Sequence, residues 1–177
     1  MRKLKNEELD RISVEEFKTK EKKPVVIVLD NVRSLNNVGS AFRTGDAFLV
    51  EKILLCGITG TPPHRDIHKT ALGAQDSVAW EYHDSTSDAL KSLRSEGFKI
   101  LSVEQADQSV SLDDFTPSKG EKYALVFGNE VFGVEEEVVA SSDQVIEIPQ
   151  YGTKHSLNIS VSMGIVLWDV IGKIKNL

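Results

Sequence analysis

The chain has 177 residues and a formal net charge of −6, enough length for one compact domain with a sizeable core but little room for a second. Hydrophobic residues make up 40% and charged residues 27% of the sequence, as in ordinary globular proteins. No apolar run approaches the roughly 20 residues of a membrane helix, and the N-terminus lacks a signal-peptide apolar segment. We therefore expect a cytoplasmic protein with no membrane association.

Charge is unevenly distributed along the chain. The acidic total argues against a surface that coats nucleic acid broadly. Residues 1–23 nevertheless carry eight lysines and arginines against six acids, a net of +2, which leaves −8 for the remainder. We interpret residues 1–23 as a basic N-terminal helical arm and residues 24–177 as the main domain. Such an arm is either a solvated, salt-bridged helix or a segment that grips RNA.

Cysteine and histidine give no sign of a metal site. The single cysteine, Cys56, cannot form an internal disulfide, and its apolar neighbours predict a buried small hydrophobe. His64 and His68 are four residues apart, but no glutamate or third ligand accompanies them. His155 beside Ser156 does not make a hydrolase pair, because adjacent residues do not face each other on a helix.

Strands and helices alternate along the chain. Ser13 and Glu16 fit a capping box that opens a short helix, and residues 25–29 form an apolar run typical of a strand buried on both faces. Further strands are expected at residues 52–56, 77–82, 98–103, 123–127 and 145–148, with helices after residue 36 and at 67–74, 88–96 and 134–140. This alternation predicts an α/β fold with a mainly parallel sheet flanked by helices.

The C-terminal segment contains a conflict between two patterns. Leu157, Ile159 and the apolar residues that follow alternate with polar ones, which on period alone favours a strand. The segment runs from Ser156 to about residue 174 without a helix breaker, which exceeds any ordinary strand. Ser156 is also a good helix N-cap, so we predict a long final helix that begins there.

The first segment with chemical potential surrounds the start of the helix after residue 36. Asn37 lies near the helix N-terminus, where free N–H groups favour a phosphate. Arg43 falls on a face beside the core positions, four residues after Gly39, and the glycine would leave space for a group to approach the guanidinium. A capping asparagine and a surface arginine remain the alternative.

The second segment, residues 127–133, directly follows a predicted strand. The glycines Gly128 and Gly133 would let a ligand touch the backbone, and parallel sheets bind ligands at the carboxyl ends of their strands. No Gly-Lys-Ser/Thr follows and no Gly-x-Gly-x-x-Gly occurs, so neither a nucleotide-hydrolase loop nor an ordinary dinucleotide crevice is predicted. A plain tight turn remains the alternative.

The third segment, residues 148–162, passes through Pro149 and Gly152 into the final helix. Ser156 and Asn158 stand there among apolar residues. Burying such side chains unpaired costs about 1–3 kcal/mol each, so we expect them to be solvated or committed to a partner.

Together the three segments resemble the SpoU-type RNA ribose 2′-O-methyltransferases of the SPOUT superfamily. Departures from that pattern are Gln150, where many members have methionine, and Gly45, where alanine is common. The resemblance covers roughly residues 24–175. It is carried by Asn37-Val38-Gly39-Ser40-Ala41-Phe42-Arg43-Thr44, by Gly128-Asn129-Glu130-Val131-Phe132-Gly133, and by Pro149-Gln150-Tyr151-Gly152-Thr153-Lys154-His155-Ser156-Leu157-Asn158-Ile159-Ser160.

The resemblance implies a deep trefoil knot near the C-terminus, one of the rare exceptions to unknotted topology. It implies S-adenosylmethionine as cofactor and a structured RNA as substrate, with tRNA (a D-loop guanosine among the candidates) ahead of rRNA. It further implies a homodimer whose active sites use both subunits, with Leu167, Trp168 and Val170 either in the dimer face or in the core. The implied cofactor-binding residues are Gly128, Ile148, Pro149, Gly152 and Leu157.

The resemblance also assigns a catalytic set, in which Asn37, Glu130, Ser156 and Asn158 orient Arg43, the phosphate and the ribose. Methyl transfer requires a ribose hydroxyl held in line with an electrophilic methyl group. The family proposal makes Arg43 the base, but a guanidinium with a pKa above about 12 is an awkward base. A phosphate clamp that stabilises charge is an equally weighted role.

Two alternatives belong to other classes of protein. One is a catalytically silent RNA-binding dimer on the same scaffold, which would have no need of all five of these polar side chains. The other is a flavodoxin-like small-molecule binder, which would bind its ligand without any dependence on RNA.

Overall fold

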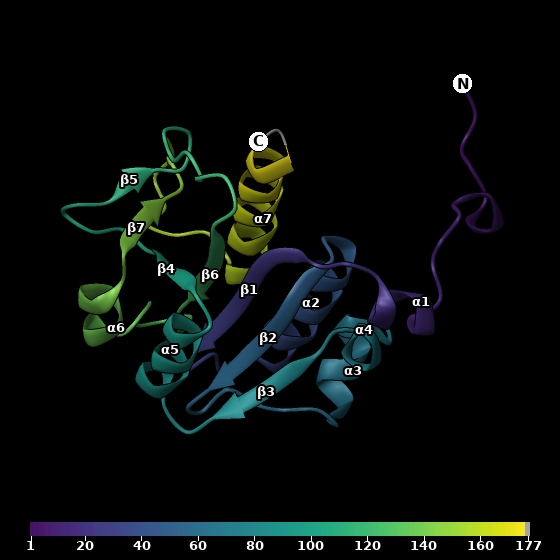
Figure 1. Cartoon of the computed structure of the whole chain (residues 1–177), viewed down its shortest axis with the longest axis horizontal. Coiled ribbons are helices and arrows are strands. Elements are labelled where there is room, and N and C mark those ends of the chain that lie inside the picture. Colours follow the sequence, from purple (N-terminus) through teal and green to yellow (C-terminus); the bar gives the residue numbers. More distant parts are fainter. Residues whose placement is uncertain (176–177) are drawn as a thin grey trace.

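The computed structural model describes residues 1–175. Within these residues seven strands form one sheet in the order β3-β2-β1-β6-β4-β7-β5, and every strand pair is parallel, which confirms the expected α/β architecture (Figure 1). The strand order does not test the knot, which stays a prediction. The strands are β1 (Lys23–Asp30), β2 (Val50–Cys56), β3 (Trp80–His83), β4 (Phe98–Val103), β5 (Val110–Ser111), β6 (Lys122–Phe127) and β7 (Gln144–Glu147).

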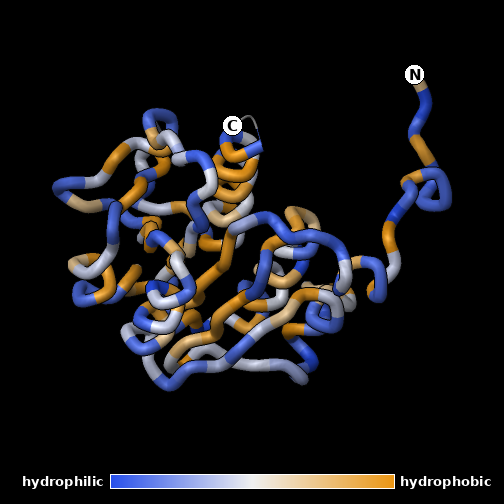
Figure 2. The backbone as a smooth tube through the Cα atoms, viewed as in Figure 1, coloured by the Kyte–Doolittle hydropathy of each residue, from blue (hydrophilic) through white to orange (hydrophobic). Residues whose placement is uncertain are grey.

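Helices cover both faces of the sheet. Ile27 and Val28 of β1 are fully buried and point into different cores, which explains why this strand reads as a continuous apolar run. In Figure 2 the central strands are hydrophobic and the outer loops largely hydrophilic. One face carries α1 (Val14–Thr19), α2 (Leu35–Ala47), α3 (Arg65–Ala71), α4 (Ala74–Ser77) and α7 (Ile159–Lys175), and the other α5 (Thr86–Ser95) and α6 (Glu136–Ser141).

The bounds of two predicted elements between residues 67 and 82 were wrong, and two short elements were missed. The helix expected at 67–74 is divided into α3 and α4, because Leu72 and Gly73 both have positive φ angles, 52° and 91°. The strand expected from residue 77 begins at Trp80, and Ser77 instead ends α4. The short elements β5 and a 3₁₀ turn at Asn6–Glu8 were not predicted.

The last helix begins at Ile159, so Ser156 is not its N-cap. The cap is Asn158, whose Oδ1 accepts a hydrogen bond from the Ser160 N–H at 2.8 Å. The asparagine therefore has a structural role that the sequence pattern did not reveal. The choice of helix over strand was nevertheless right.

The N-terminal arm is tied to the body through one helix. Ser13 and Glu16 form the predicted capping box of α1, and Phe17 of this helix is buried in the core. The preceding residues, 1–13, are exposed and extend away from the body (Figure 1). The division at residue 23 and the role of the arm stay predictions.

Cys56 is buried, as predicted, and burial raises the pKa of its thiol to about 12. None of the helices within residues 1–175 has the length and apolar character needed to cross a membrane. The same part of the chain contains no group of three or more His, Cys, Asp or Glu side chains arranged to hold a metal ion.

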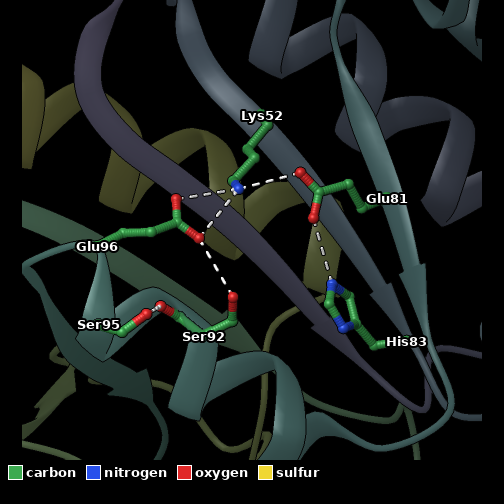
Figure 3. Close-up of polar contacts among 6 residues, drawn as sticks. All are labelled: Lys52, Glu81, His83, Ser92, Ser95 and Glu96. Carbon is green, nitrogen blue, oxygen red and sulfur yellow. Dashed lines mark hydrogen bonds and ion pairs between the residues drawn. The ribbon is translucent and has the colours of Figure 1, made fainter.

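A lysine with two carboxylate partners joins the edge of the sheet to α5 (Figure 3). The Nζ atom of Lys52, on β2, lies 3.0 Å from Glu81 Oε1 and 3.2 Å from Glu96 Oε2, and the lysine side chain is only 14% exposed. Burial raises the pKa of Glu81, but the hydrogen bonds and positive charges of Lys52 and His83 together outweigh burial and leave that pKa below its ordinary value. These ion pairs join β2, β3 and the end of α5, and they are strongest when the lysine and both carboxylates are charged.

Glu81→Gln tests this tie through its pH dependence. Because the folded-state pKa of Glu81 is depressed, its stabilisation is present above the unfolded pKa and disappears as the pH falls through the folded value. At pH 7 we expect the variant to lose about 0.5 kcal/mol of unfolding free energy, a small value because Glu81 is half exposed. In urea unfolding, the difference in stability between the parent and the variant should be smaller at pH 3 than at pH 7 and approach zero. An equal difference at both pH values would contradict an ionic origin of the stabilisation.

Candidate functional site

A cleft of about 950 Å³ opens at the carboxyl ends of β4, β6 and β7, within the size range of small-molecule sites. Its walls are the loops after β4 and β6 and the segment between β7 and α7. Three of the predicted cofactor residues, Gly128, Ile148 and Leu157, line it, whereas Pro149 and Gly152 are not among the lining residues.

Glu130 connects the loop after β6 to the loop after β1. Its Oε1 accepts hydrogen bonds from the Ser34 N–H and the Asn37 amide, both at 2.9 Å, and its Oε2 accepts one from the Arg33 N–H at 3.0 Å. Burial raises the pKa of Glu130, but these donors outweigh burial and hold that pKa below its usual range. The carboxylate is therefore ionised and committed on both oxygens.

Asn37 extends this connection to the final helix. Its Oδ1 accepts a hydrogen bond from Ser160 Oγ at 3.1 Å and lies 3.5 Å from Asn158 Nδ2. The structure thus brings together Glu130, Asn37 and Asn158, three of the five predicted catalytic residues. We call this group, with Ser160, the Glu130 bracket.

Two residues of this region were missed as site residues. Ser160 belongs to the third motif, but nothing in the sequence places its hydroxyl against Asn37. Asn129, 9% exposed, donates from Nδ2 to the Asn31 carbonyl at 2.7 Å, and its Oδ1 accepts from the N–H groups of Val131 and Phe132. An asparagine between a strand and a tight turn is a recognisable signal for such a turn.

The loop after β1 is also held by hydrogen bonds of Asn31 and of the buried Asp30. Asn31 adopts a left-handed conformation, φ 54°, and its amide donates to Asp30 at 3.1 Å and to Glu135 at 2.7 Å. Asp30 is fully buried and accepts hydrogen bonds from the Thr86 hydroxyl at 2.5 Å and the Glu135 N–H at 2.8 Å. These contacts hold the loop in place before any ligand binds.

The glycines of the motifs act differently from the prediction. A Cβ on Gly39 would lie 2.1 Å from Thr70 Oγ1, so this glycine lets α3 pack against α2 and does not open space beside Arg43. A Cβ on Gly128 would lie 2.0 Å from the carbonyl carbon of Gly133. This glycine is therefore needed to close its own turn, whether or not a ligand touches the backbone there.

Arg43 and Ser156 lie outside the hydrogen-bonded bracket. Arg43 is exposed, and at about 100° per residue it stands about 120° around the α2 axis from Asn37. Within residues 1–175 its guanidinium donates no hydrogen bond to the other four predicted residues. Ser156 is exposed and lines the cleft beside Asn158.

A family model described as the SpoU rRNA Methylase family matches residues 24–168, most of the chain. The chain belongs to the SpoU rRNA methylase family. This membership confirms the resemblance seen in the three motifs.

Relatives of this SpoU family protein include enzymes named for tRNA and for rRNA. The tRNA (guanosine(18)-2′-O)-methyltransferase of Thermus thermophilus is 29% identical over 92% of this chain and 81% of its own length. The crystal structure of the A. aeolicus TrmH/SpoU tRNA modifying enzyme matches with a TM-score of 0.81 and 28% identity, covering 92% of this chain and 81% of that one. An AdoMet-bound rRNA methyltransferase from Sinorhizobium meliloti matches with a TM-score of 0.78 and 27% identity, covering 84% of this chain but only 56% of that one.

Glu130→Gln tests the bracket as a structural device. The glutamine keeps only one acceptor oxygen, and its NH₂ group takes the place of the other. In one orientation the NH₂ group faces the Arg33 N–H, and in the other it faces the Ser34 N–H and the Asn37 NH₂. In both cases two donors face each other and a hydrogen bond is lost. We expect a loss of about 1–2 kcal/mol of unfolding free energy at pH 7 in urea denaturation. Glu137→Gln on the exposed face of α6 is the matched control and should cost less than about 0.5 kcal/mol. Equal losses in both variants would contradict the role given to Glu130.

Proposed function

We propose that this protein transfers a methyl group from S-adenosylmethionine to a ribose 2′-hydroxyl of a structured RNA. The observation that carries the proposal is the Glu130 bracket, which fixes polar side chains of three separate segments beside the cleft that Glu130 and Asn158 line. Family membership, a relative named as a tRNA 2′-O-methyltransferase and a similar structure of an AdoMet-bound rRNA methyltransferase support it. We favour tRNA, with a D-loop guanosine as the first candidate, and keep rRNA as the alternative.

The cleft suits S-adenosylmethionine in size and in lining. Its wall combines apolar side chains, such as Phe127 and Ile148, with backbone and carboxylate groups that suit a purine nucleoside and an amino-acid tail. When bound, the cofactor supplies an electrophilic methyl group. We assign its contacts to Gly128, Ile148 and Leu157, and give Pro149 and Gly152 the indirect role of shaping the segment between β7 and α7.

The side chains around the bracket would position the ribose. Both oxygens of Glu130 are occupied by N–H donors, so we give this residue an orienting role and not that of the base. Ser156 lines the cleft and Asn158 caps α7 beside Asn37, where their polar atoms can contact the sugar. Arg43 would hold the adjoining phosphate and stabilise the hydroxyl as it loses its proton.

Arg43 lies outside the Glu130 bracket of its own subunit, so a second subunit would supply the arginine of each site. The face of α7 that carries Val161, Ile165 and Trp168 is apolar and exposed, with Trp168 74% exposed and stacked edge-on against Phe48 at 6.4 Å. Leu167 and Val170, the other expected members of the dimer face, are buried in the subunit's own core. We therefore propose a homodimer that buries the Trp168 face and completes each site with the partner's arginine.

The direct test is transfer of tritiated methyl groups from S-adenosylmethionine to bulk tRNA and rRNA from a strain that lacks the gene. We expect incorporation into one RNA class and a single 2′-O-methyl position on mapping. Cofactor binding with no incorporation into any RNA would instead favour the silent RNA-binding dimer. Flavin binding without RNA dependence would favour a small-molecule binder.

Arg43→Ala should lower the rate of methyl transfer about 100-fold or more, because it removes a group that stabilises developing charge. The affinity for S-adenosylmethionine, measured by calorimetry, should stay within about twofold, since Arg43 does not line the cleft. Lys99→Ala, an exposed cation at the amino end of β4, is the control and should leave both values unchanged. Parallel loss of cofactor affinity and activity in Arg43→Ala would count against the assignment.

Trp168→Glu should dissociate the proposed dimer, because a carboxylate would then be buried in an apolar interface without a partner. Light scattering after gel filtration should report the monomer mass, and methyl transfer should fall with the dimer fraction. Leu72→Glu, which changes an apolar side chain 65% exposed at the end of α3, is the matched control. An active, monomeric Trp168→Glu protein would reject the shared active site.

A further inference from the structure

Phe132 is exposed although the other phenylalanines of the chain are buried or partly buried. It is 83% exposed, and its neighbour Val131 is 67% exposed. Burial of a phenyl ring stabilises a fold by about 1.5–3 kcal/mol, and the exposed ring of Phe132 contributes little of this stabilisation. The ring sits at the tip of the turn between Gly128 and Gly133 and lines the mouth of the cleft.

The turn that carries Phe132 is held by several hydrogen bonds. The Asn129 and Gly133 backbones exchange hydrogen bonds at 2.8 and 2.9 Å, and Asn129 Oδ1 accepts from the Phe132 N–H at 3.2 Å. Gly133 completes the turn with a positive φ of 71°. A ring on such a turn is presented with little backbone freedom left to lose, which lowers the ordering cost when a partner binds.

Phe132 is two residues from Glu130, and both line the cleft near the place assigned to the ribose. On this basis, which rests on the proposed function, we propose that Phe132 is a stacking platform for an unpaired base of the RNA substrate beside the methylated ribose. Proteins that bind single-stranded RNA commonly stack its bases on aromatic side chains.

The overall charge of the protein supports an RNA base as the occupant. With a formal net charge of −6, non-specific attraction to phosphates is weak, and contacts that do not depend on charge must supply more of the affinity. Stacking is such a contact, and any base can provide it because every base has a flat π face.

The test compares Phe132→Ala, Phe132→Tyr and the control Leu72→Ala in the full-length protein. The dissociation constant for labelled bulk tRNA and rRNA is measured by filter binding at several salt concentrations, beside the affinity for S-adenosylmethionine. We expect Phe132→Ala to weaken binding of the substrate RNA class about tenfold, with the tyrosine variant and the control within about twofold of the parent. The slope of affinity against salt should not change, because no phosphate contact is lost.

Three results would overturn the platform. They are unchanged RNA affinity in Phe132→Ala, a changed oligomeric state, which would assign the ring to a protein interface, or an equal loss of cofactor affinity. The test measures RNA binding directly, so its outcome does not depend on methyl transfer. A parent protein that binds RNA through Phe132 without methylating any would refute the proposed function and retain the platform.

Discussion

The Glu130 carboxylate is the interaction on which the arrangement of the site depends. It accepts hydrogen bonds from the backbone of Arg33 and Ser34 and from the side chain of Asn37, residues that lie more than ninety positions away in sequence. Asn37 in turn meets Ser160 at the start of α7. Glu130 and Asn37 together therefore join the loop after β6, the segment after β1 and the start of α7.

The parallel sheet makes this connection possible. Strands β1 and β6 are neighbours, with Leu29 paired to Phe127, so the loops that follow them leave the sheet side by side. Asp30, buried beneath these loops, receives donors from α5 and from the start of α6. A buried carboxylate is tolerated there because N–H and O–H groups replace the water it has lost.

Much of the fold was predictable from hydrophobic period and turn residues, whereas the site was predictable mainly through its motifs. The start of α7 was wrong by three residues, because Ser156 and Asn158 are both good caps and only the three-dimensional path selects between them. The role of Gly39 was wrong because sequence does not show which helix packs against it. Ser160 was missed because its partner, Asn37, belongs to a distant segment.

The separation of Arg43 from the bracket has a consequence for regulation of the proposed chemistry. If the arginine acts from the partner subunit, a lone subunit can form the cofactor cleft and the bracket but cannot clamp a phosphate beside them. Assembly of the dimer would then be a condition for catalysis, and a free monomer could bind S-adenosylmethionine without using it. In such a dimer, selection among RNAs would depend on where the few cations lie, because the formal net charge of −6 gives little broad attraction to phosphates.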